Sequence, residues 1–307
     1  MAVHRVGRRA ILPGLVAMAA GLTGQASAGQ ASAGQADAEP ALRIVAAENF
    51  YADVARQIAG PDAVVSAILS NPDSDPHMFE ASPSVARALA GASIVIANGA
   101  DYDPWMAKLL AASPAAQRRS LVVAGLLHRA PGGNPHLWYD PAALPALAVA
   151  LTGALSAMDP GNAAAYAARL AAFQAGFAPV VARVAALRAK FAGVPVTATE
   201  PVFGPMAAAL GLAMRNERFQ LAVMNGTEPA ASDVMAFERD IKQRAVRVLF
   251  YNSQASDPSA QRLLAMAQAA HIPVVGVTET QPAGTTVQGW LLSTLDAVAQ
   301  ALSGPAS

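Results

Sequence analysis

The feature that most constrains this fold is a repeated alternation of short apolar runs with helical patterns. The runs are rich in Val, Ile and Ala, which is typical of strands buried on both faces. They lie at 42–48, 63–69, 93–99, 120–125, 194–200, 247–252 and 272–279. Helical apolar spacing appears at 51–59, 82–92, 202–210, 258–271 and 286–302. Because parallel strands need crossover connections, the sequence predicts an α/β fold with mostly parallel sheets flanked by helices.

One long helical pattern separates the two groups of strands. Residues 162–191 keep helical apolar spacing throughout, and at about 1.5 Å per residue they would form a rod of roughly 45 Å. Pro179 lies inside this pattern, so we expect a kink or a break there. The simplest architecture is two lobes joined by one long rigid helix. We expect an N-terminal lobe at 42–160, the linking helix at 161–192 and a C-terminal lobe at 193–307.

The first 28 residues have the composition of an export signal. Three arginines at positions 5, 8 and 9 precede an apolar run at 10–22, and Ala-Ser-Ala ends the segment. The apolar run is too short to span a membrane comfortably, and the small residues suit a cleavage site. We therefore expect a signal peptide at 1–28 and a flexible tether at 29–41. The paired arginines leave twin-arginine export open beside the ordinary secretory route.

Charge and cysteine content exclude several classes of protein. The chain has 21 basic and 21 acidic residues, and loss of the first 28 residues would leave 18 against 21, a net charge of −3. This balance does not favour a nucleic-acid partner. The chain has no cysteine, which excludes a disulfide framework, a thiolate metal site and a lipid-modified N-terminal cysteine. We expect a soluble, periplasmic monomer.

Four side chains in loops after the predicted strands could bind a metal. His77 in NPDSDPHMFEASP and His136 in GGNPHLWYDP each follow a proline and precede an aromatic residue. Glu200 and Glu279 end the apolar runs 194–200 and 272–279. Because ligands of parallel α/β sheets bind at the carboxyl ends of the strands, we expect these side chains to converge. Taken singly, each is more often a hydrogen-bonding group at a surface, so the prediction depends on the combination.

Two imidazoles and two carboxylates would neutralise a divalent cation. Such a set suits Zn²⁺, Mn²⁺ or Fe²⁺ better than Ca²⁺ or Mg²⁺, which prefer oxygen ligands alone. A proline next to His77, His136 and Glu200 restrains each loop, which lowers the entropy lost when a metal binds.

The first histidine segment continues as SDPHMFEASPSVARALAGASIVIANGADYDPWM, which resembles the signature of the metal-binding receptors of ABC importers, the ZnuA-, TroA- and PsaA-type proteins. The matching elements are Asp75-Pro76-His77, Phe79, Pro83, Asn98-Gly99 and Trp105. The segment NPHLWYDP is similar to the second signature, with His136, Trp138 and Asp140-Pro141. The resemblance runs from about residue 42 to residue 302.

The resemblance implies a solute-binding protein, without catalytic activity, that captures a divalent transition metal in the periplasm and delivers it to a membrane permease of an ABC transporter. The family's first three ligands correspond to His77, His136 and Glu200, and Glu279 stands where the family usually has an aspartate. The paired glutamates favour Mn²⁺ or Fe²⁺, whereas the Irving–Williams order favours Zn²⁺, so the metal stays open. A metallohydrolase with one glutamate as general base and an adhesin remain as alternatives.

Overall fold

The computed structural model describes residues 42–71, 79–254 and 258–304 of the chain. The expected signal peptide (1–28), the expected tether (29–41) and His77 lie outside the described residues. Residues Glu39–Ser307 form one compact unit. Two sheets of four parallel strands lie within this unit, so the expected α/β class with two lobes is confirmed.

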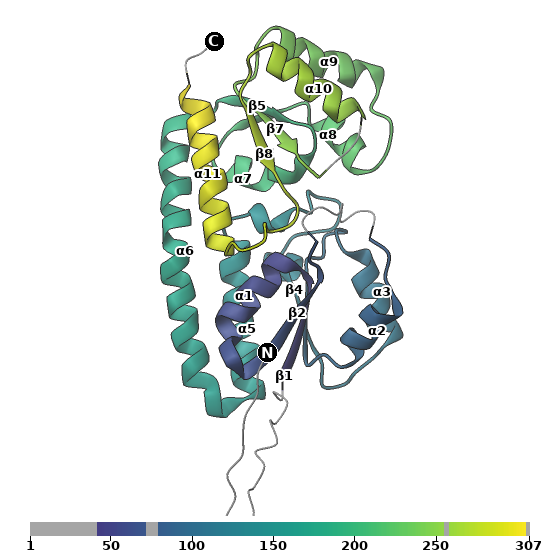
Figure 1. The fold of residues 1–307 in the computed structure, drawn as a ribbon, viewed down its shortest axis with the longest axis vertical. Helices are drawn as coiled ribbons and strands as arrows, with labels where there is room; N and C mark the ends of the chain where they lie inside the picture. The colour runs from purple at the N-terminus through teal and green to yellow at the C-terminus, as the bar shows by residue number, and fades with distance from the viewer. Residues whose placement is uncertain (1–41, 72–78, 255–257, 305–307) are drawn as a thin grey trace, which may run out of the picture. The chain divides into compact units, whose positions relative to one another are not determined.

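The first sheet has the strand order β2-β1-β3-β4, and every neighbouring pair is parallel. Its strands are β1 (Leu42–Glu48), β2 (Ala63–Leu69), β3 (Ile94–Ala97) and β4 (Arg119–Val122). Alternate residues of β1 point to opposite faces. Ile44 packs on the side of α1 (Asn49–Ala59) and α5 (Ala143–Met158), whereas Val45 packs on the side of α2 (Pro83–Ala90) and α3 (Pro104–Ala112). Helices therefore cover both faces (Figure 1).

The second sheet repeats the same order, β6-β5-β7-β8, again with parallel strands only. Its strands are β5 (Pro195–Ala198), β6 (Ala213–Arg215), β7 (Leu249–Asn252) and β8 (Val274–Val277). Five helices accompany it: α7 (Gly204–Ala209), α8 (Glu217–Met224), α9 (Ala231–Lys242), α10 (Pro258–Ala269) and α11 (Val287–Ser303). Of the expected ligands, Glu200 and Glu279 lie in the loops that follow β5 and β8, and His136 lies in the connection between β4 and α5.

The linking helix α6 (Ala163–Phe191) packs along α5 and α11 (Figure 1). Its buried stripe repeats every three or four residues: Phe173, Phe177, Val180, Val184, Leu187 and Phe191. The segment 160–191 is long and apolar enough to cross a membrane by length and composition, but a core helix meets the same criteria, and this stripe belongs to the main core. The helix runs through Pro179 without the break that was one of the two expected outcomes. Pro179 is exposed, so water can bind the carbonyl that lacks its helical partner.

Several elements differ from the sequence prediction. Strand β4 ends at Val122, and the chain continues as the short helix α4 (Val123–Leu126) rather than as a strand to residue 125. The Ala124 N–H donates to the Asn98 carbonyl, which turns the backbone out of the sheet. The expected helix at 202–210 begins as the 3₁₀ turn η5 (Pro201–Phe203) and continues as α7.

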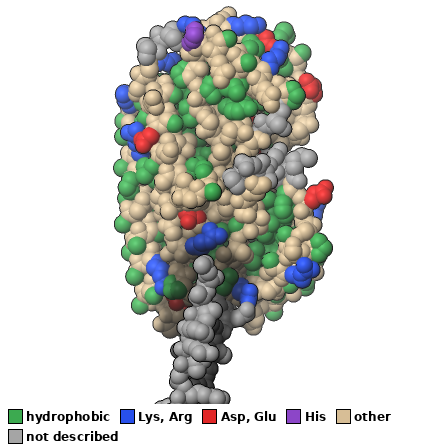
Figure 2. Space-filling view, in the orientation of Figure 1, with side chains coloured by type: hydrophobic (Ala, Val, Ile, Leu, Met, Phe, Trp, Pro, Cys, Tyr) green, Lys and Arg blue, Asp and Glu red, His purple; other side chains and the backbone are tan. Residues whose placement is uncertain are grey.

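Charged side chains are spread thinly over the surface. On the face drawn in Figure 2, Lys, Arg, Asp and Glu of the described residues lie singly or in small groups among apolar and neutral atoms. The two signs are interspersed there, in agreement with the balanced composition. The described residues drawn on this face therefore form no extended basic surface of the kind that binds nucleic acid.

Candidate metal centre

Three of the four expected ligands lie buried at the carboxyl ends of the strands. His136 precedes the 3₁₀ turn η3 (Leu137–Tyr139), Glu200 follows β5, and Glu279 follows β8. Their exposed fractions are 0%, 8% and 1%. His136 Nε2 of the first lobe lies 3.4 Å from Glu279 Oε2 of the second lobe. The structure therefore brings one nitrogen and one oxygen donor together where the two lobes meet.

Asn252 connects the two glutamates of the second lobe. It ends β7, is 2% exposed, and its Nδ2 donates to Glu200 Oε2 at 2.6 Å and to Glu279 Oε1 at 2.8 Å. Two carboxylates that share a buried site repel each other unless donors or cations compensate them. One amide thus holds both acids in place. The sequence reasoning missed Asn252, although it ends the run RVLFYN and a polar residue at a strand end was the signal used for the glutamates.

Asn134 fixes the orientation of His136. Its Oδ1 accepts the His136 backbone N–H at 3.0 Å and lies 2.7 Å from His136 Nδ1. An amide oxygen can only accept, so Nδ1 carries the proton and Nε2 is the nitrogen that faces Glu279. A neutral imidazole in this tautomer is the form that binds a metal through Nε2.

The same Asn134 side chain reaches the second lobe. Its Nδ2 donates to the Pro201 carbonyl at 2.6 Å, next to Glu200. A Cβ atom on Gly204 would lie 2.5 Å from Asn134 Nδ2, so only glycine at that position allows this approach. Asn134 thus connects the histidine of one lobe to the glutamate segment of the other.

Two tyrosines of the first lobe contact the Glu279 segment. Tyr102 donates its hydroxyl hydrogen to Glu279 Oε2 at 3.1 Å, and Tyr139 donates to the Thr278 carbonyl at 3.1 Å. Burial, with the nearby Glu279 carboxylate as a second cause, raises the pKa of Tyr102 well above its usual value. Burial also raises the pKa of Tyr139. Both hydroxyls therefore remain neutral donors.

The Asn98-Gly99 pair supports the loop that carries His136. Asp103 accepts the backbone N–H groups of both residues, at 2.7 and 2.8 Å. Asn98 Nδ2 donates to the Pro135 carbonyl at 2.8 Å, and Asn98 Oδ1 accepts the Tyr51 hydroxyl at 2.6 Å. This part of the first signature thus positions the histidine of the second.

Glu48 is a buried carboxyl group that the sequence reasoning missed. It ends β1, is 0% exposed, and neither of its carboxyl oxygens has a hydrogen-bond partner among the residues that the structure describes. Burial, and then the negative charge of Asp103, raises the pKa of Glu48 well above its usual value of 4.5. The group is therefore held in its protonated form more strongly than in an unfolded chain. Its place at a strand end is the same signal that singled out Glu200 and Glu279.

The described residues alone do not complete a metal site. Within 42–71, 79–254 and 258–304, no group of three or more His, Cys, Asp or Glu side chains has the spacing needed to hold a metal. The expected set includes His77, which lies outside these ranges. His128 and His271 are exposed and lie elsewhere.

Comparison with known proteins gives a consistent assignment. Residues 44–301 match the family described as zinc-uptake complex component A, periplasmic (ZnuA). A putative metal-binding protein of Thermotoga maritima is 30% identical over 100 residues, which are 32% of this chain and 34% of that protein. The chain therefore matches about a third of the length of this curated relative.

The same fold is found in solved structures. The periplasmic zinc binding protein TroA from Treponema pallidum superposes with a TM-score of 0.73 at 20% identity, over 86% of this chain and 99% of that one. A Mn-bound mutant of a periplasmic metal binding protein from Candidatus Liberibacter asiaticus gives 0.70 at 15% identity, over 85% and 99%. A ZnuA crystal structure gives 0.68 at 22% identity, over 87% and 99%. These likenesses establish the fold. Because the family match covers most of the sequence, the chain belongs to the ZnuA family of periplasmic metal-binding receptors, as its two histidine motifs predicted.

Proposed function

We propose that this protein is the periplasmic receptor of an ABC importer for a divalent transition metal. It captures one ion of zinc or manganese, or of iron, between its lobes and delivers it to a membrane permease. The proposed ligands are His77, His136, Glu200 and Glu279. The observation that carries the proposal is the buried approach of His136 Nε2 to Glu279 Oε2 at 3.4 Å.

This distance fits two atoms that bind the same ion. Metal–ligand bonds of about 2.1 Å at a tetrahedral angle separate two donor atoms by about 3.4 Å. Asn134 leaves His136 Nε2 as the donor nitrogen, and Asn252 holds Glu200 beside Glu279. The donors are thus arranged before the ion arrives, which lowers the entropy that binding costs.

The donor set supports binding rather than catalysis. Four protein ligands would close a tetrahedral coordination sphere and leave no position for a reactive water. The ZnuA family is a family of binding proteins, which disfavours the metallohydrolase alternative. Two neutral imidazoles and two carboxylates would neutralise the ion, and protonation of either histidine would compete with it. We therefore expect uptake at neutral pH and weaker binding on acidification.

The deciding experiment is elemental analysis of the protein isolated from its own periplasm. We expect about one equivalent of metal in the wild type and little in the His77→Ala/His136→Ala variant. His271→Ala is the matched control, because His271 is exposed and lies away from the site. Equal metal content in the wild type and the double variant would refute the assignment.

A further inference from the structure

Helix α1 carries three polar side chains on one face, beside its buried apolar residues. Asn49, Asp53 and Gln57 follow one another at intervals of four residues, which places them on the same side. All three are half-buried, whereas Phe50, Tyr51, Val54, Ala55 and Ile58 are buried in the core. This stripe, which we call the α1 polar ladder, faces the chain segment that follows Glu279.

The first rung is a reciprocal pair between Asn49 and Gln281. Asn49 Nδ2 donates to the Gln281 carbonyl at 2.8 Å, and the Gln281 N–H donates to Asn49 Oδ1 at 2.9 Å. One side chain thereby satisfies both backbone polar groups of a residue only two positions after Glu279.

The second rung joins Asp53 to the start of α11. Asp53 Oδ2 accepts the Val287 N–H at 2.8 Å and also the Gln57 Nε2 hydrogen at 2.9 Å. Val287 is the first residue of α11, so its N–H has no partner within the helix. A carboxylate at this end also interacts favourably with the helix dipole.

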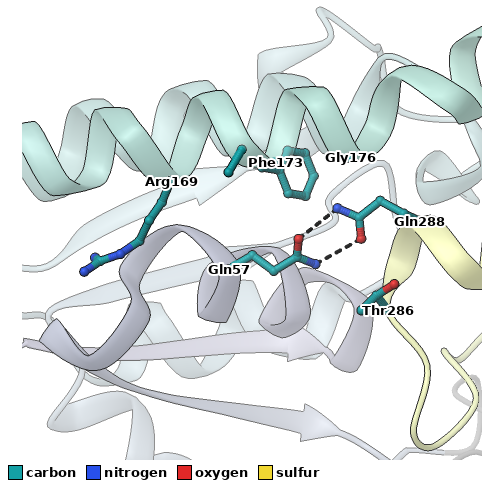
Figure 3. Close-up of a pocket in the computed structure, with 7 residues that line it drawn as sticks. Gln57, Arg169, Phe173, Gly176, Thr286 and Gln288 are labelled. Carbon is teal, nitrogen blue, oxygen red and sulfur yellow. Dashed lines mark hydrogen bonds between the residues drawn. The ribbon is translucent and has the colours of Figure 1, made fainter.

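The third rung is the side-chain amide pair of Gln57 and Gln288. Each amide donates to the other, at 3.1 and 2.8 Å (Figure 3). An open cavity of about 400 Å³ borders this rung and is lined by Arg169, Phe173 and Thr286, among others. Replacing Gln57 by alanine would enlarge this cavity, but it would remove no contact of the segment near Glu279.

The ladder belongs to the first lobe, whereas Glu279 follows a strand of the second lobe. Glu279 is thus held from both sides: β8 and the Gln254 side chain, which accepts the Glu279 N–H, fix one side, and Asn49 fixes the other through Gln281. We propose that Asn49 is a positioning residue for metal binding, because the pair that it forms with Gln281 sets the Glu279 carboxylate opposite His136. Asp53 and Gln57 hold the more distant part of the same segment. This inference rests on the proposed function, in which Glu279 binds the ion.

The test compares two hydrogen-bonded pairs of the α1 polar ladder, Asn49–Gln281 and Gln57–Gln288, which differ in their distance from Glu279 along the chain. Asn49→Ala removes one reciprocal pair, and Gln57→Ala removes one reciprocal pair and the hydrogen bond to Asp53, so Gln57→Ala should lose at least as much thermal stability as Asn49→Ala. Metal affinity, measured by competition with a chromophoric chelator, should fall about 10-fold in Asn49→Ala, as for the loss of an outer-shell partner. It should change less than about 3-fold in Gln57→Ala. Asn49→Asp keeps the acceptor for the Gln281 N–H, so its loss of metal affinity should be intermediate between the losses in Asn49→Ala and Gln57→Ala.

A double-mutant cycle shows whether Asn49 acts through Glu279. In the Glu279→Gln background, Asn49→Ala should cause no further loss of affinity, whereas independent effects would add. Equal effects of the Asn49 and Gln57 variants, an unchanged affinity in Asn49→Ala, or full additivity with Glu279→Gln would overturn the inference. His136→Ala separates this failure from that of the proposed function. If His136→Ala abolishes binding while Asn49→Ala binds normally, only the role of Asn49 is lost.

Discussion

Replacing Asn134 by alanine should weaken metal binding without touching any proposed ligand. The change removes the acceptor of the His136 Nδ1 proton (2.7 Å), the acceptor of the His136 backbone N–H (3.0 Å) and the donor to the Pro201 carbonyl (2.6 Å). Loss of the partner that orients a histidine ligand typically costs 10- to 100-fold in affinity. This corresponds to about 1.4–2.8 kcal/mol of binding free energy. The three lost hydrogen bonds should also lower the free energy of unfolding of the metal-free protein by about 2 kcal/mol.

Asn134→Asp separates the two effects. Aspartate retains an acceptor for His136 Nδ1 and forms the carboxylate–histidine pair that raises the basicity of a ligand, so affinity should stay within about 3-fold of the wild type. It loses the donor to Pro201 and places a negative charge against that carbonyl, so stability should fall about as much as in the alanine variant. Binding is measured by chelator competition, stability by thermal unfolding without metal, and the ring tautomer by ¹⁵N NMR.

The matched control is Asn162→Ala. The Asn162 side chain donates to Asp159 at the start of α6, away from the candidate site. The Asn162→Ala variant should leave the metal affinity unchanged. The reasoning is refuted if Asn134→Ala binds metal within about 3-fold of the wild type, or if the alanine and aspartate variants lose affinity equally.

Three further changes test neighbouring parts of the account. Asn252→Asp sets a third carboxylate against Glu200 and Glu279, so it should destabilise the metal-free protein by about 3 kcal/mol and enlarge the rise in melting temperature on metal addition, as seen by calorimetry. Gly204→Ala brings a Cβ to within 2.5 Å of Asn134 Nδ2 and should lower affinity, whereas Gly153→Ala, where a Cβ meets nothing within 4 Å, should not. Because the pKa of Glu48 is raised in the folded state, wild-type stability should fall as pH rises above about 4.5, by up to about 1.4 kcal/mol per pH unit until pH passes the folded pKa. Glu48→Gln should reduce that slope in urea titrations at several pH values, while Asp103, whose pKa is also raised by burial, contributes the remainder; an unchanged slope would contradict the assignment.

The sequence predicted the elements whose apolar runs have sharp ends. Strands β1 and β2 begin and end at the expected residues, 42–48 and 63–69, because polar or small residues bound both runs. Helix α5 was missed because it is apolar on most sides and shows little helical periodicity. The helices α8 and α9 pack around a small separate core, and the short strand β6 (Ala213–Arg215) packs on the main core through Met214. The patterns of these three elements contain too few apolar residues to stand out.

The candidate site was predictable where it depends on position along one strand. Glu200 and Glu279 lie just after β5 and β8, as the rule that ligands lie at strand ends predicts. His136 lies beyond β4 and the short helix α4, so its place depends on the loop that follows them. Asn49, Tyr102 and Asn134 could not be found in this way, because each acts on a residue far away in the sequence: Asn49 on Gln281, Tyr102 on Glu279, and Asn134 on Pro201. Such pairs are fixed only when the two lobes pack together. The metal-binding roles of His77, His136, Glu200 and Glu279 stay predictions.

The most direct test of the central claim is an anomalous-scattering map of crystals of the metal-loaded protein, recorded at the absorption edge of the bound metal. The account predicts one strong peak where the lobes meet, about 2.0–2.2 Å from a nitrogen of His77, from His136 Nε2 and from carboxylate oxygens of Glu200 and Glu279. A peak at any other place, or one that contacts residues of a single lobe only, would contradict it.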